Sequence, residues 1–397
     1  MRLVSALTPV LFPFVLVAQQ QVTRADAVAA ALARGARAAL ARADTTAALG
    51  AARAARAFPN PTVSGSYSKD TPNYHALGEL PLDLPWLRAP RIGAAESARD
   101  AARYRFAFER AAIRFDVDTT YTRGLAAALH ARLSRRTALD ADSLLRIAEL
   151  RRDVGDVSEL DVRLAAVNAG QLANIAADDS LAALETLLSL QLQMGLTGDE
   201  PTIALVDSLR PPLDSALTEG RVLLPIAAAE ASLRSAERSL AFARRSRFAP
   251  NLQLGFDTGD PASATPHQLL PVVGFSLPFP LFNLGRGDVL RASAERDRAR
   301  AELDLTRRET AAAVARTRRD LAAARDRLRR TAGLVESANR IAVMSLRAYS
   351  EGAIPLANVL EAQRNAREIL ARYIDDLATA DAAARALKLL TAGRDEP

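Results

Sequence analysis

Catalysis requires nucleophiles, acid–base pairs or metal ligands at defined spacings, and this chain of 397 residues has few residues of these types. Its three histidines, His75, His130 and His267, are far apart in the sequence and form no zinc motif such as HExxH. The chain has no cysteine to act as a nucleophile or zinc ligand, and the GRG at 285–287 is too short for a phosphate-binding loop. The sequence therefore predicts a protein that is not an enzyme, with no catalytic, cofactor-binding or metal site.

The charge pattern argues against nucleic acid as a partner. The net charge is +6 and the pI is about 10.1. However, the arginines alternate with acidic residues, as in RDRARAELDLTRRE at 296–309. This is typical of solvated helix faces with ion pairs between residues i and i+4. We expect no nucleic-acid partner.

The N-terminus has the pattern of a signal peptide. Arg2 precedes an apolar run that ends before Ala18, and this run is too short for a spanning helix. We predict a signal peptide at 1–18 and export of the mature chain. After it, no apolar run approaches the roughly 18 residues that a membrane helix needs. If the mature chain enters a membrane, it must do so as strands.

An internal repeat organises the rest of the sequence. DVGDVSELDVRLAA at 153–166 matches SEGAIPLANVLEAQ at 350–363, with Gly155 aligned to Gly352, and 352 − 155 gives an offset of 197. The same offset aligns LPLDL at 80–84 with LPFPL at 277–281. We predict a duplication with a first repeat at 19–190, a loop-rich connector at 191–222 and a second repeat at 223–393.

Each repeat contains two candidate strands in which apolar and polar residues alternate. In the first repeat they lie at about 61–68 and 79–86, and in the second at about 251–257 and 272–282. His75 and His267 fall in the outer loops expected between these strands. The residues expected on one apolar face are Leu80, Leu82, Leu84, Trp86, Val273, Phe275, Leu277, Phe279 and Leu281. The opposite face carries small and polar residues, so the pattern predicts two-faced strands.

Long helices follow the strands. The stretches 91–153 and 288–350 have helix-forming composition without proline, and each is far longer than a compact domain allows. In the second, Val314, Leu321, Leu328 and Val335 recur every seven residues, with Ala324, Thr331 and Ala338 three further on, which predicts a coiled-coil seam. Tip turns are expected at 154–158 and 351–355, with shorter helices at about 22–57, 159–194 and 213–247. Gly155 and Gly352 can take the left-handed conformation that ends a helix. Ser158 with Asp161 has the spacing of a capping box, and Pro355 suits the first turn of the next helix.

Four strands per chain form an open sheet, and a bilayer does not tolerate open sheet edges. Three chains would supply twelve strands, an even number suited to a closed barrel. We therefore predict a mainly α fold with membrane β-strands. A homotrimer would form a 12-stranded β-barrel in contact with outer-membrane lipid, continued by a coiled-coil helical barrel.

The sequence resembles the TolC-like outer-membrane efflux proteins over nearly all of the mature chain. The resemblance rests on the duplicated order of strands and long helix and on the motifs DVGDVSELD at 153–161 and AYSEGAIPLANVLEA at 348–362. SLPFPLFNLGRG at 276–287 resembles the branch that serves cobalt, zinc and cadmium efflux. The resemblance implies a passive exit duct in the outer membrane with its helical tunnel in the periplasm. Its implied partners are a periplasmic adaptor and a proton-driven inner-membrane transporter.

The resemblance also implies roles for the tips. The turn residues expected to dock the adaptor are Val154, Gly155, Asp156, Val157, Ser158, Glu351, Gly352, Ala353, Ile354 and Pro355. The residues placed at the periplasmic aperture are Asp161, Tyr349, Asn358 and Glu361. Asn358 stands where an acid is expected and Ile354 where some members carry a basic residue, which argues against a strong charge-locked gate. Threefold rings of Asp161 and Glu361 would favour cations.

Two alternatives remain. The same duct could serve type I protein secretion, which the sequence does not separate from efflux. A chain of a different class, an exported soluble coiled-coil scaffold with a small sheet, would bury the apolar strand face or carry polar residues on both faces. The apolar alternation from Val273 to Leu281 argues against this scaffold.

Overall fold

The computed structural model of the chain describes residues 19–70, 72–212, 223–246, 249–258, 269–278 and 284–392. The predicted signal peptide lies outside these residues. Two compact units are present, and each draws on both halves of the sequence. Unit 1 comprises Met1–Gly35, Ile113–Leu213 and Leu321–Arg385, and unit 2 comprises Ala36–Ala112, Asp214–Asp320 and Ala386–Pro397. The units therefore do not coincide with the two predicted repeats.

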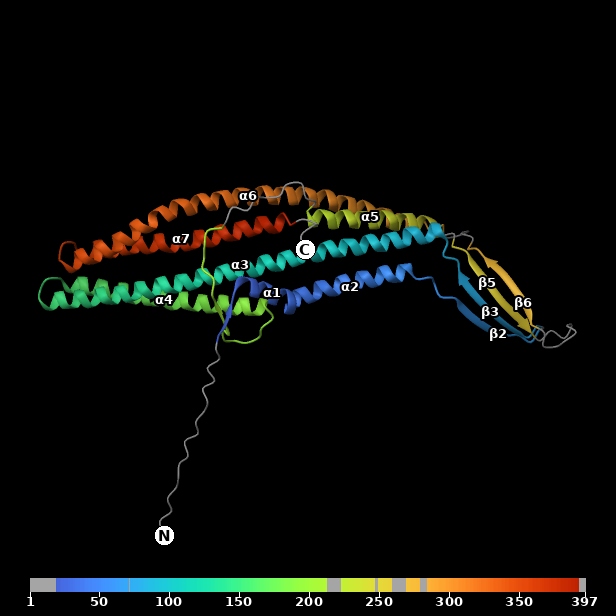
Figure 1. The fold of residues 1–397 in the computed structure, drawn as a ribbon, viewed down its shortest axis with the longest axis horizontal. Helices are drawn as coiled ribbons and strands as arrows, with labels where there is room; N and C mark the ends of the chain where they lie inside the picture. The colour runs from blue at the N-terminus through green and yellow to red at the C-terminus, as the bar shows by residue number, and fades with distance from the viewer. Residues whose placement is uncertain are drawn as a thin grey trace, which may run out of the picture. The chain divides into compact units, whose positions relative to one another are not determined.

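Helices dominate the chain (Figure 1). They are α1 (Arg24–Arg34), α2 (Ala36–Arg56), α3 (Pro85–Asp153), α4 (Glu159–Gln193), α5 (Leu224–Arg245), α6 (Arg286–Ser350) and α7 (Leu356–Leu390). The two long helices are confirmed, with 69 residues in α3 and 65 in α6. Within the described residues, no helix combines the length and the apolar character needed to cross a membrane.

The helix expected at about 22–57 is two helices. Gly35 lies between α1 and α2 with an extended backbone, φ −62° and ψ 135°, which ends α1. A Cβ at Gly35 would lie 2.3 Å from the carbonyl oxygen of Ala31, so a larger residue does not fit there without a shift. For the helix expected at about 213–247, the described part begins at Leu224.

The predicted seam of α6 packs against α7. Leu321, Ala324, Leu328, Thr331 and Ala338 are buried. Ala324 and Leu328 of α6 form a cluster with Leu377 and Ala380 of α7. Alternation of large and small side chains along a heptad lets two helices approach closely, so these residues confirm the predicted seam.

Four strands form one antiparallel sheet in unit 2. They are β2 (Thr62–Tyr67), β3 (Tyr74–Pro81), β5 (Asn251–Thr258) and β6 (Leu270–Ser276), in the order β2-β3-β5-β6. β3 and β5 are the central pair, with Leu80 opposite Leu252 and Gly78 opposite Leu254. One strand pair from each half of the sequence therefore meets in the middle of the sheet.

The strand predicted at 79–86 was misplaced. β3 ends at Pro81, and α3 begins at Pro85, so Leu82 and Leu84 follow the strand and Trp86 lies in the helix. Pro85 has no N–H to donate to a strand partner, whereas proline fits the first turn of a helix well. The alternating leucines of LPLDLPW lie where the chain leaves the sheet, and the strand itself begins earlier, at Tyr74.

A proline near the start of α3 removes one hydrogen-bond donor of the helix, and a side chain from α5 replaces it. Pro90 cannot donate to the carbonyl of Trp86, four residues before it. Arg245 at the end of α5 donates to that carbonyl instead, at 3.3 Å. Nearby, the side chain of Asp83 is only 1% exposed and pairs with Arg88 at 2.8 Å and Arg91 at 2.6 Å. These contacts fix the chain where it passes from sheet to helix.

A small parallel strand pair in unit 1 was not predicted. β1 (Gln20–Val22) pairs with β4 (Ile203–Leu205) from the stretch expected to be a loop-rich connector. The fully buried Tyr121 of α3 donates its hydroxyl proton to the carbonyl of Val22 at 2.9 Å. The backbone N–H of Asp207 donates to the same hydroxyl at 3.4 Å. One side chain thus ties the N-terminal strand and the connector to the long helix.

Burial raises the pKa of Tyr121 to about 12. The unfolded chain ionises near its ordinary value of 10, so stability is fully present below pH 10 and falls as the pH rises towards 12. We predict that Tyr121→Phe removes the part of the stability loss at alkaline pH that comes from this tyrosine. The variant should also lower the free energy of unfolding at neutral pH by about 1 kcal/mol, because one hydrogen bond is lost. Urea unfolding between pH 8 and pH 12 measures both effects. The exposed Tyr67→Phe is the matched control, and equal pH dependence in both variants would contradict the prediction.

Candidate functional site

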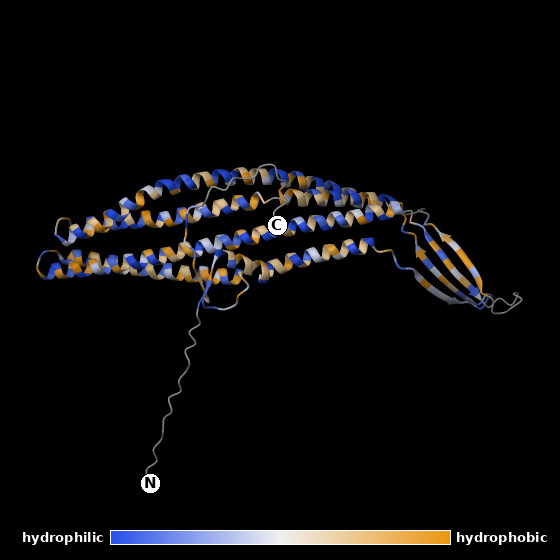
Figure 2. Cartoon of the chain, in the orientation of Figure 1, coloured by the Kyte–Doolittle hydropathy of each residue, from blue (hydrophilic) through white to orange (hydrophobic). Residues whose placement is uncertain are grey.

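The antiparallel register places apolar side chains on one face of the sheet. Across the strands this face carries Val63 and Tyr67, then Tyr74, Ala76 and Leu80, then Leu252, Leu254 and Phe256, and finally Val273 and Phe275. Val273 is 75% exposed, Phe275 63% and Leu254 49%. Figure 2 shows the hydrophobic colour alternating along these strands. Among the elements that the structure describes, none covers this apolar face.

The opposite face of the sheet is polar and includes both carboxylates of the four strands. Asp257 receives a hydrogen bond from the ring Nδ1 of His75 at 2.9 Å, and Glu79 receives one from Asn251 at 2.7 Å. Gln253 and the serines of β2 share this face. Neither lysine nor arginine occurs within the four strands. Leu77, Leu270 and Val272 also lie on this face, so it presents negative and neutral polar groups together with some apolar side chains.

Some of the residues predicted for the apolar face lie on it, and others lie beyond the strand ends or outside the described residues. Leu80, Val273 and Phe275 share the exposed apolar face. Leu277 is exposed but lies just past the end of β6, and Leu82 and Leu84 lie past the end of β3. Phe279 and Leu281 are outside the described residues. His75, expected in an outer loop, lies within β3, and His267 is also outside the described residues.

Both tips in unit 1 close with the same backbone hydrogen bonds. At the end of α3, Gly155 N–H donates to the carbonyl of Arg152 and Asp156 N–H to that of Arg151, both at 2.8 Å. At the end of α6, Gly352 and Ala353 make the equivalent bonds at 2.9 and 2.8 Å. The two glycines have φ values of +80° and +76°, which only glycine adopts without strain. The predicted left-handed helix ends are confirmed.

The helices that leave the tips begin differently. Ser158 and Asp161 form the predicted capping box at the start of α4, with the Asp161 carboxylate accepting from the backbone N–H and the hydroxyl of Ser158. In the second tip, Pro355 precedes α7 rather than lying within its first turn. Because of the capping box, the Asp161 carboxylate accepts hydrogen bonds at the start of its own helix.

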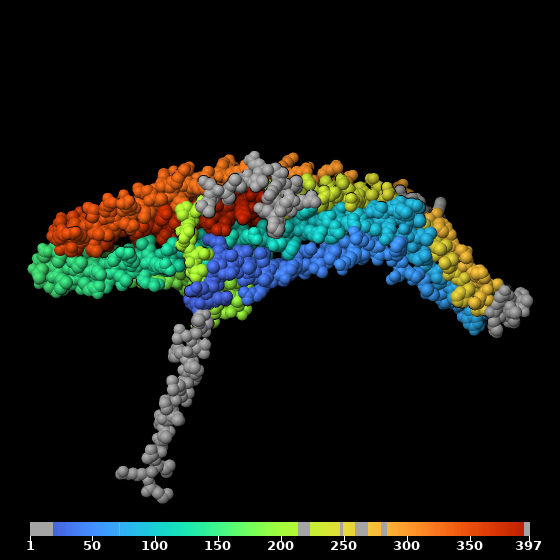
Figure 3. Space-filling model, viewed as in Figure 1, coloured from blue at the N-terminus to red at the C-terminus, as the bar shows by residue number. Residues whose placement is uncertain are grey.

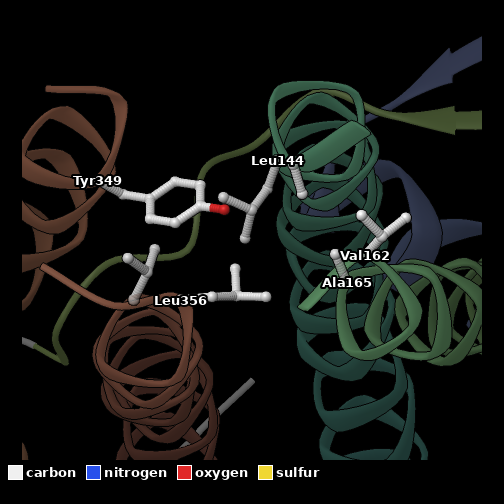
Figure 4. Packing of buried hydrophobic residues seen from close by; sticks show 7 residues of the cluster. Leu144, Val162, Ala165, Tyr349 and Leu356 are labelled. Carbon is white, nitrogen blue, oxygen red and sulfur yellow. The ribbon is translucent and has the colours of Figure 1, made fainter. Parts of the chain in front are cut away.

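A hydrophobic cluster joins the four helices behind the tips (Figure 4). Its buried members are Leu144, Ala148, Val162, Ala165, Tyr349, Leu356 and Val359. Ile354 is partly buried and packs against this cluster. Tyr349, placed at the periplasmic aperture from the sequence, is only 1% exposed in this chain. It continues the buried seam of α6 four residues after Ser345, so the ring points into the core.

Arg151 connects the two tips and was missed by sequence reasoning. Its guanidinium donates to the carbonyl of Tyr349 at 2.9 Å and lies 4.8 Å from the centre of the Tyr349 ring. It also pairs with Asp156 at 2.6 Å. These residues line a cleft with a volume of about 340 Å³ that also includes Asp161 and Ile354. Arg151 is one of many arginines in helical stretches, and nothing in its spacing distinguishes it.

The predicted aperture residues do not form one cluster. Asp161 and Tyr349 line the tip cleft. Asn358 and Glu361 are exposed on α7, where Glu361 pairs with Arg364 at 2.9 Å and accepts from Asn365 at 3.1 Å. Among the residues with described positions, no three of His, Asp and Glu come close enough to bind a metal ion. The arrangement offers docking and electrostatic surfaces rather than reacting groups.

Comparison with known proteins places these features in context. Residues 224–393 match the sequence profile of the family described as "Outer membrane efflux protein". Over 257 residues the chain is 26% identical to the cobalt-zinc-cadmium resistance protein CzcC of Cupriavidus metallidurans. That match covers 62% of this chain and 60% of CzcC, so the chain spans less than two thirds of this relative.

Two solved structures share the fold. The crystal structure of CusC superimposes with a TM-score of 0.78 at 16% identity, covering 93% of this chain and 92% of that one. The outer membrane protein VceC from Vibrio cholerae gives a TM-score of 0.77 at 17% identity, with coverages of 93% and 96%. At these identities the likeness concerns the fold, which confirms the predicted mainly helical architecture.

Arg151 provides a test of how the two tips are held together. Arg151→Ala removes the hydrogen bond and the ring contact between the hairpins, so we predict a broader distribution of distances between them. Spin labels on cysteines introduced at Val154 and Ala353 would report this distribution, since the chain has no native cysteine. Arg152→Ala is the matched control, because the ion pairs of Arg152 within the described residues are with Asp153 and Glu159 of its own hairpin. Equal broadening in both variants would contradict the role of Arg151.

Proposed function

Because this chain belongs to the outer membrane efflux protein family, we propose that it forms the outer-membrane exit duct of a tripartite efflux pump. The family consists of channels without enzyme activity, which confirms the prediction that the chain is not an enzyme. In this proposal the duct conducts solutes passively, and the inner-membrane partner supplies the energy. Family members generally trimerise and work with adaptor proteins and inner-membrane transporters.

The observation that carries the proposal is the exposed apolar face of the four-stranded sheet. Exposure of this face to water costs free energy in proportion to its apolar area, roughly 25 cal/mol per Å². Contact with lipid avoids that cost. The two edges, β2 and β6, need partners in lipid, and a homotrimer would supply them by closing twelve strands into one barrel. The polar face would then line the water-filled interior.

The tips are the proposed docking site for the periplasmic adaptor. Val154, Gly155, Asp156, Glu351 and Gly352 are exposed, and the backbone of each turn is fixed by its own hydrogen bonds. A turn with a fixed shape loses little conformational entropy on binding. Arg151 holds the two turns together, so that a partner would meet both as one surface.

The cargo we propose is cationic, with cobalt, zinc and cadmium ions as candidates. Glu79 and Asp257 place negative charge on the polar sheet face, where the strands carry neither lysine nor arginine. Asp161 and Glu361 would add carboxylates near the aperture, and rings of carboxylates favour cations. The relative CzcC is a cobalt-zinc-cadmium resistance protein. A proton-driven transporter is the proposed partner in the inner membrane.

Type I protein secretion is the second candidate, since the same duct would serve it. A soluble exported scaffold is disfavoured, because the sheet exposes rather than buries its apolar face. An ATP-driven exporter encoded beside the gene would favour secretion, and a proton-driven transporter would favour efflux.

Neighbouring residues of β5 test whether the apolar face meets lipid. Leu254 and Gln253 lie on opposite faces of the sheet. We predict that a membrane-impermeant maleimide labels Gln253→Cys in native outer membranes and leaves Leu254→Cys unlabelled. Both variants should react after denaturation in detergent, which controls for the intrinsic reactivity of the cysteines. Equal labelling of both in native membranes would contradict the barrel, as would a native mass of a monomer in mild detergent.

The cargo is tested by deletion of the gene. We predict lower tolerance to cobalt, zinc and cadmium salts, with restoration by the wild-type gene. Unchanged metal tolerance combined with lower tolerance to hydrophobic drugs would reject the metal assignment and leave the exit duct in place. Loss of an exported protein from the medium, with no change in tolerance to metals or drugs, would favour secretion.

A further inference from the structure

The region of unit 2 where the helices meet the sheet carries an excess of positive charge. We call it the collar and define it as residues 53–60, 82–96, 244–246 and 284–291. It contains eight arginines but only three acidic residues, which are Asp83, Glu96 and Asp288. The four strands that border it contain neither lysine nor arginine. The collar is therefore a basic region at one end of the sheet.

Hydrogen bonds join the helix ends of the collar. The guanidinium of Arg88 in α3 donates to the carbonyl of Arg56, the last residue of α2, at 2.8 Å. Because the last carbonyls of a helix have no partner within it, Arg88 caps α2. The bond from Arg245 to the carbonyl of Trp86 joins α5 to α3 in the same way. Figure 3 shows the ends of α2 and α3, in blue and light blue, directly beside the strands.

The acids of the collar neutralise only half of its arginines. The arginines that pair with them are Arg56, Arg88, Arg91 and Arg291. Within the described residues, the arginines without an acidic partner are Arg53, Arg244, Arg245 and Arg286, all of them exposed. A guanidinium that no carboxylate neutralises is available for another anion, and its planar fork matches the oxygens of a phosphate group. The collar therefore offers several phosphate-binding groups at one level.

Exposed aromatic rings lie at both ends of the sheet. In the collar, Trp86 is 51% exposed and Phe58 is 69% exposed, with the guanidinium of Arg88 lying 3.9 Å from the centre of the Phe58 ring. At the far end, the exposed rings of Tyr67 and Tyr74 lie 5.2 Å apart. Aromatic side chains favour the two interfaces between lipid and water. The rings therefore place the collar at the level of lipid headgroups.

We propose that the unpaired arginines of the collar bind the headgroups of anionic phospholipids in the leaflet that faces the periplasm. This inference rests on the proposed function, which places the apolar sheet face in lipid, and adds the class of lipid that is bound. The apolar face reaches Leu80, only two residues before the collar begins at Leu82. One lipid molecule can therefore place its phosphate on the arginines and its acyl chains against the sheet. A free phosphate ion or an acidic protein would use the charge alone.

Trp86 allows lipid binding to be measured without an added label, because it is the only tryptophan of the chain and lies in the collar. Bromine atoms on the acyl chains of a lipid quench the fluorescence of a nearby tryptophan. The protein is placed in bilayers that mix phosphatidylcholine with brominated phosphatidylglycerol, and then in mixtures with the bromine on phosphatidylcholine instead. We expect phosphatidylglycerol to bind about fivefold more tightly at low salt, since one arginine beside an anionic headgroup contributes on that order.

A triple variant removes the proposed phosphate ligands. It combines Arg53→Gln, Arg244→Gln and Arg286→Gln and keeps Arg245, whose bond to the carbonyl of Trp86 joins two helices. We expect its preference for phosphatidylglycerol over phosphatidylcholine to fall to about one. Circular dichroism and native mass establish that the variant folds and assembles as the wild-type protein does.

The matched control removes the same charge from exposed positions outside the collar. It combines Arg110→Gln, Arg308→Gln and Arg318→Gln, which lie about 20 Å or more along α3 and α6 from the collar. This separation exceeds the Debye length of about 10 Å at moderate salt, so these arginines do not sense the headgroups. We expect the control to keep the fivefold preference.

The outcomes separate the lipid site from the duct itself. Equal binding of both lipids by the wild-type protein, or an equal fall in the triple variant and its control, overturns the lipid site and leaves the exit duct standing. Inorganic phosphate at constant ionic strength should leave the preference in place. Loss of the preference in phosphate would assign the arginines to the free ion and overturn the lipid assignment. A protein that does not enter the bilayers and is quenched by neither lipid overturns the duct and the lipid site together.

Discussion

In the proposed function the structure depends on one constraint, that an apolar sheet face in contact with lipid cannot leave its two edges unpaired. Among the described residues of one chain, β2 and β6 have no outer strand partners, and lipid offers no hydrogen bonds to their backbone groups. In the proposed trimer the helices would therefore hold the strands of several copies in register. α2 leads into β2 and α5 into β5, while β3 and β6 lead into α3 and α6. The nearly buried Asp83 lies at the junction between β3 and α3, where two arginines neutralise it, so the angle between sheet and helix is fixed by charge as well as packing.

Duplication followed by divergence explains how the two tips complement each other. At the offset of 197 residues, Gly155 corresponds to Gly352 and both tips keep the same hydrogen bonds. The counterpart of Arg151 is Ala348, and the counterpart of Arg152 is Tyr349. The first tip therefore supplies the guanidinium, and the second supplies the ring and the carbonyl that receive it. Two copies of the first tip would lack the ring, and two copies of the second would lack the guanidinium.

The sequence predicted those parts of the fold in which one short-range rule dominates. The seam of α6, the left-handed glycines and the capping box of Ser158 follow from spacing and backbone preference alone. The strand at 79–86 was wrong because alternating leucines outweighed Pro85, which begins a helix instead. The β1–β4 pair, Arg151 and the burial of Tyr349 depend on which elements meet in space, and neither composition nor periodicity encodes that.

The position of Tyr349 affects the free energy needed to separate the tips. Its hydroxyl is buried with no hydrogen-bond partner among the described residues, and a buried unpaired hydroxyl costs roughly 1–3 kcal/mol. Separation of the hairpins would hydrate this group and recover that cost, while it would expose the ring and break the contact with Arg151. The two effects oppose each other, so the closed tip is held mainly by apolar packing and one arginine. The partly buried Ile354 adds to this packing, and a tip closed by packing does not need a network of ion pairs.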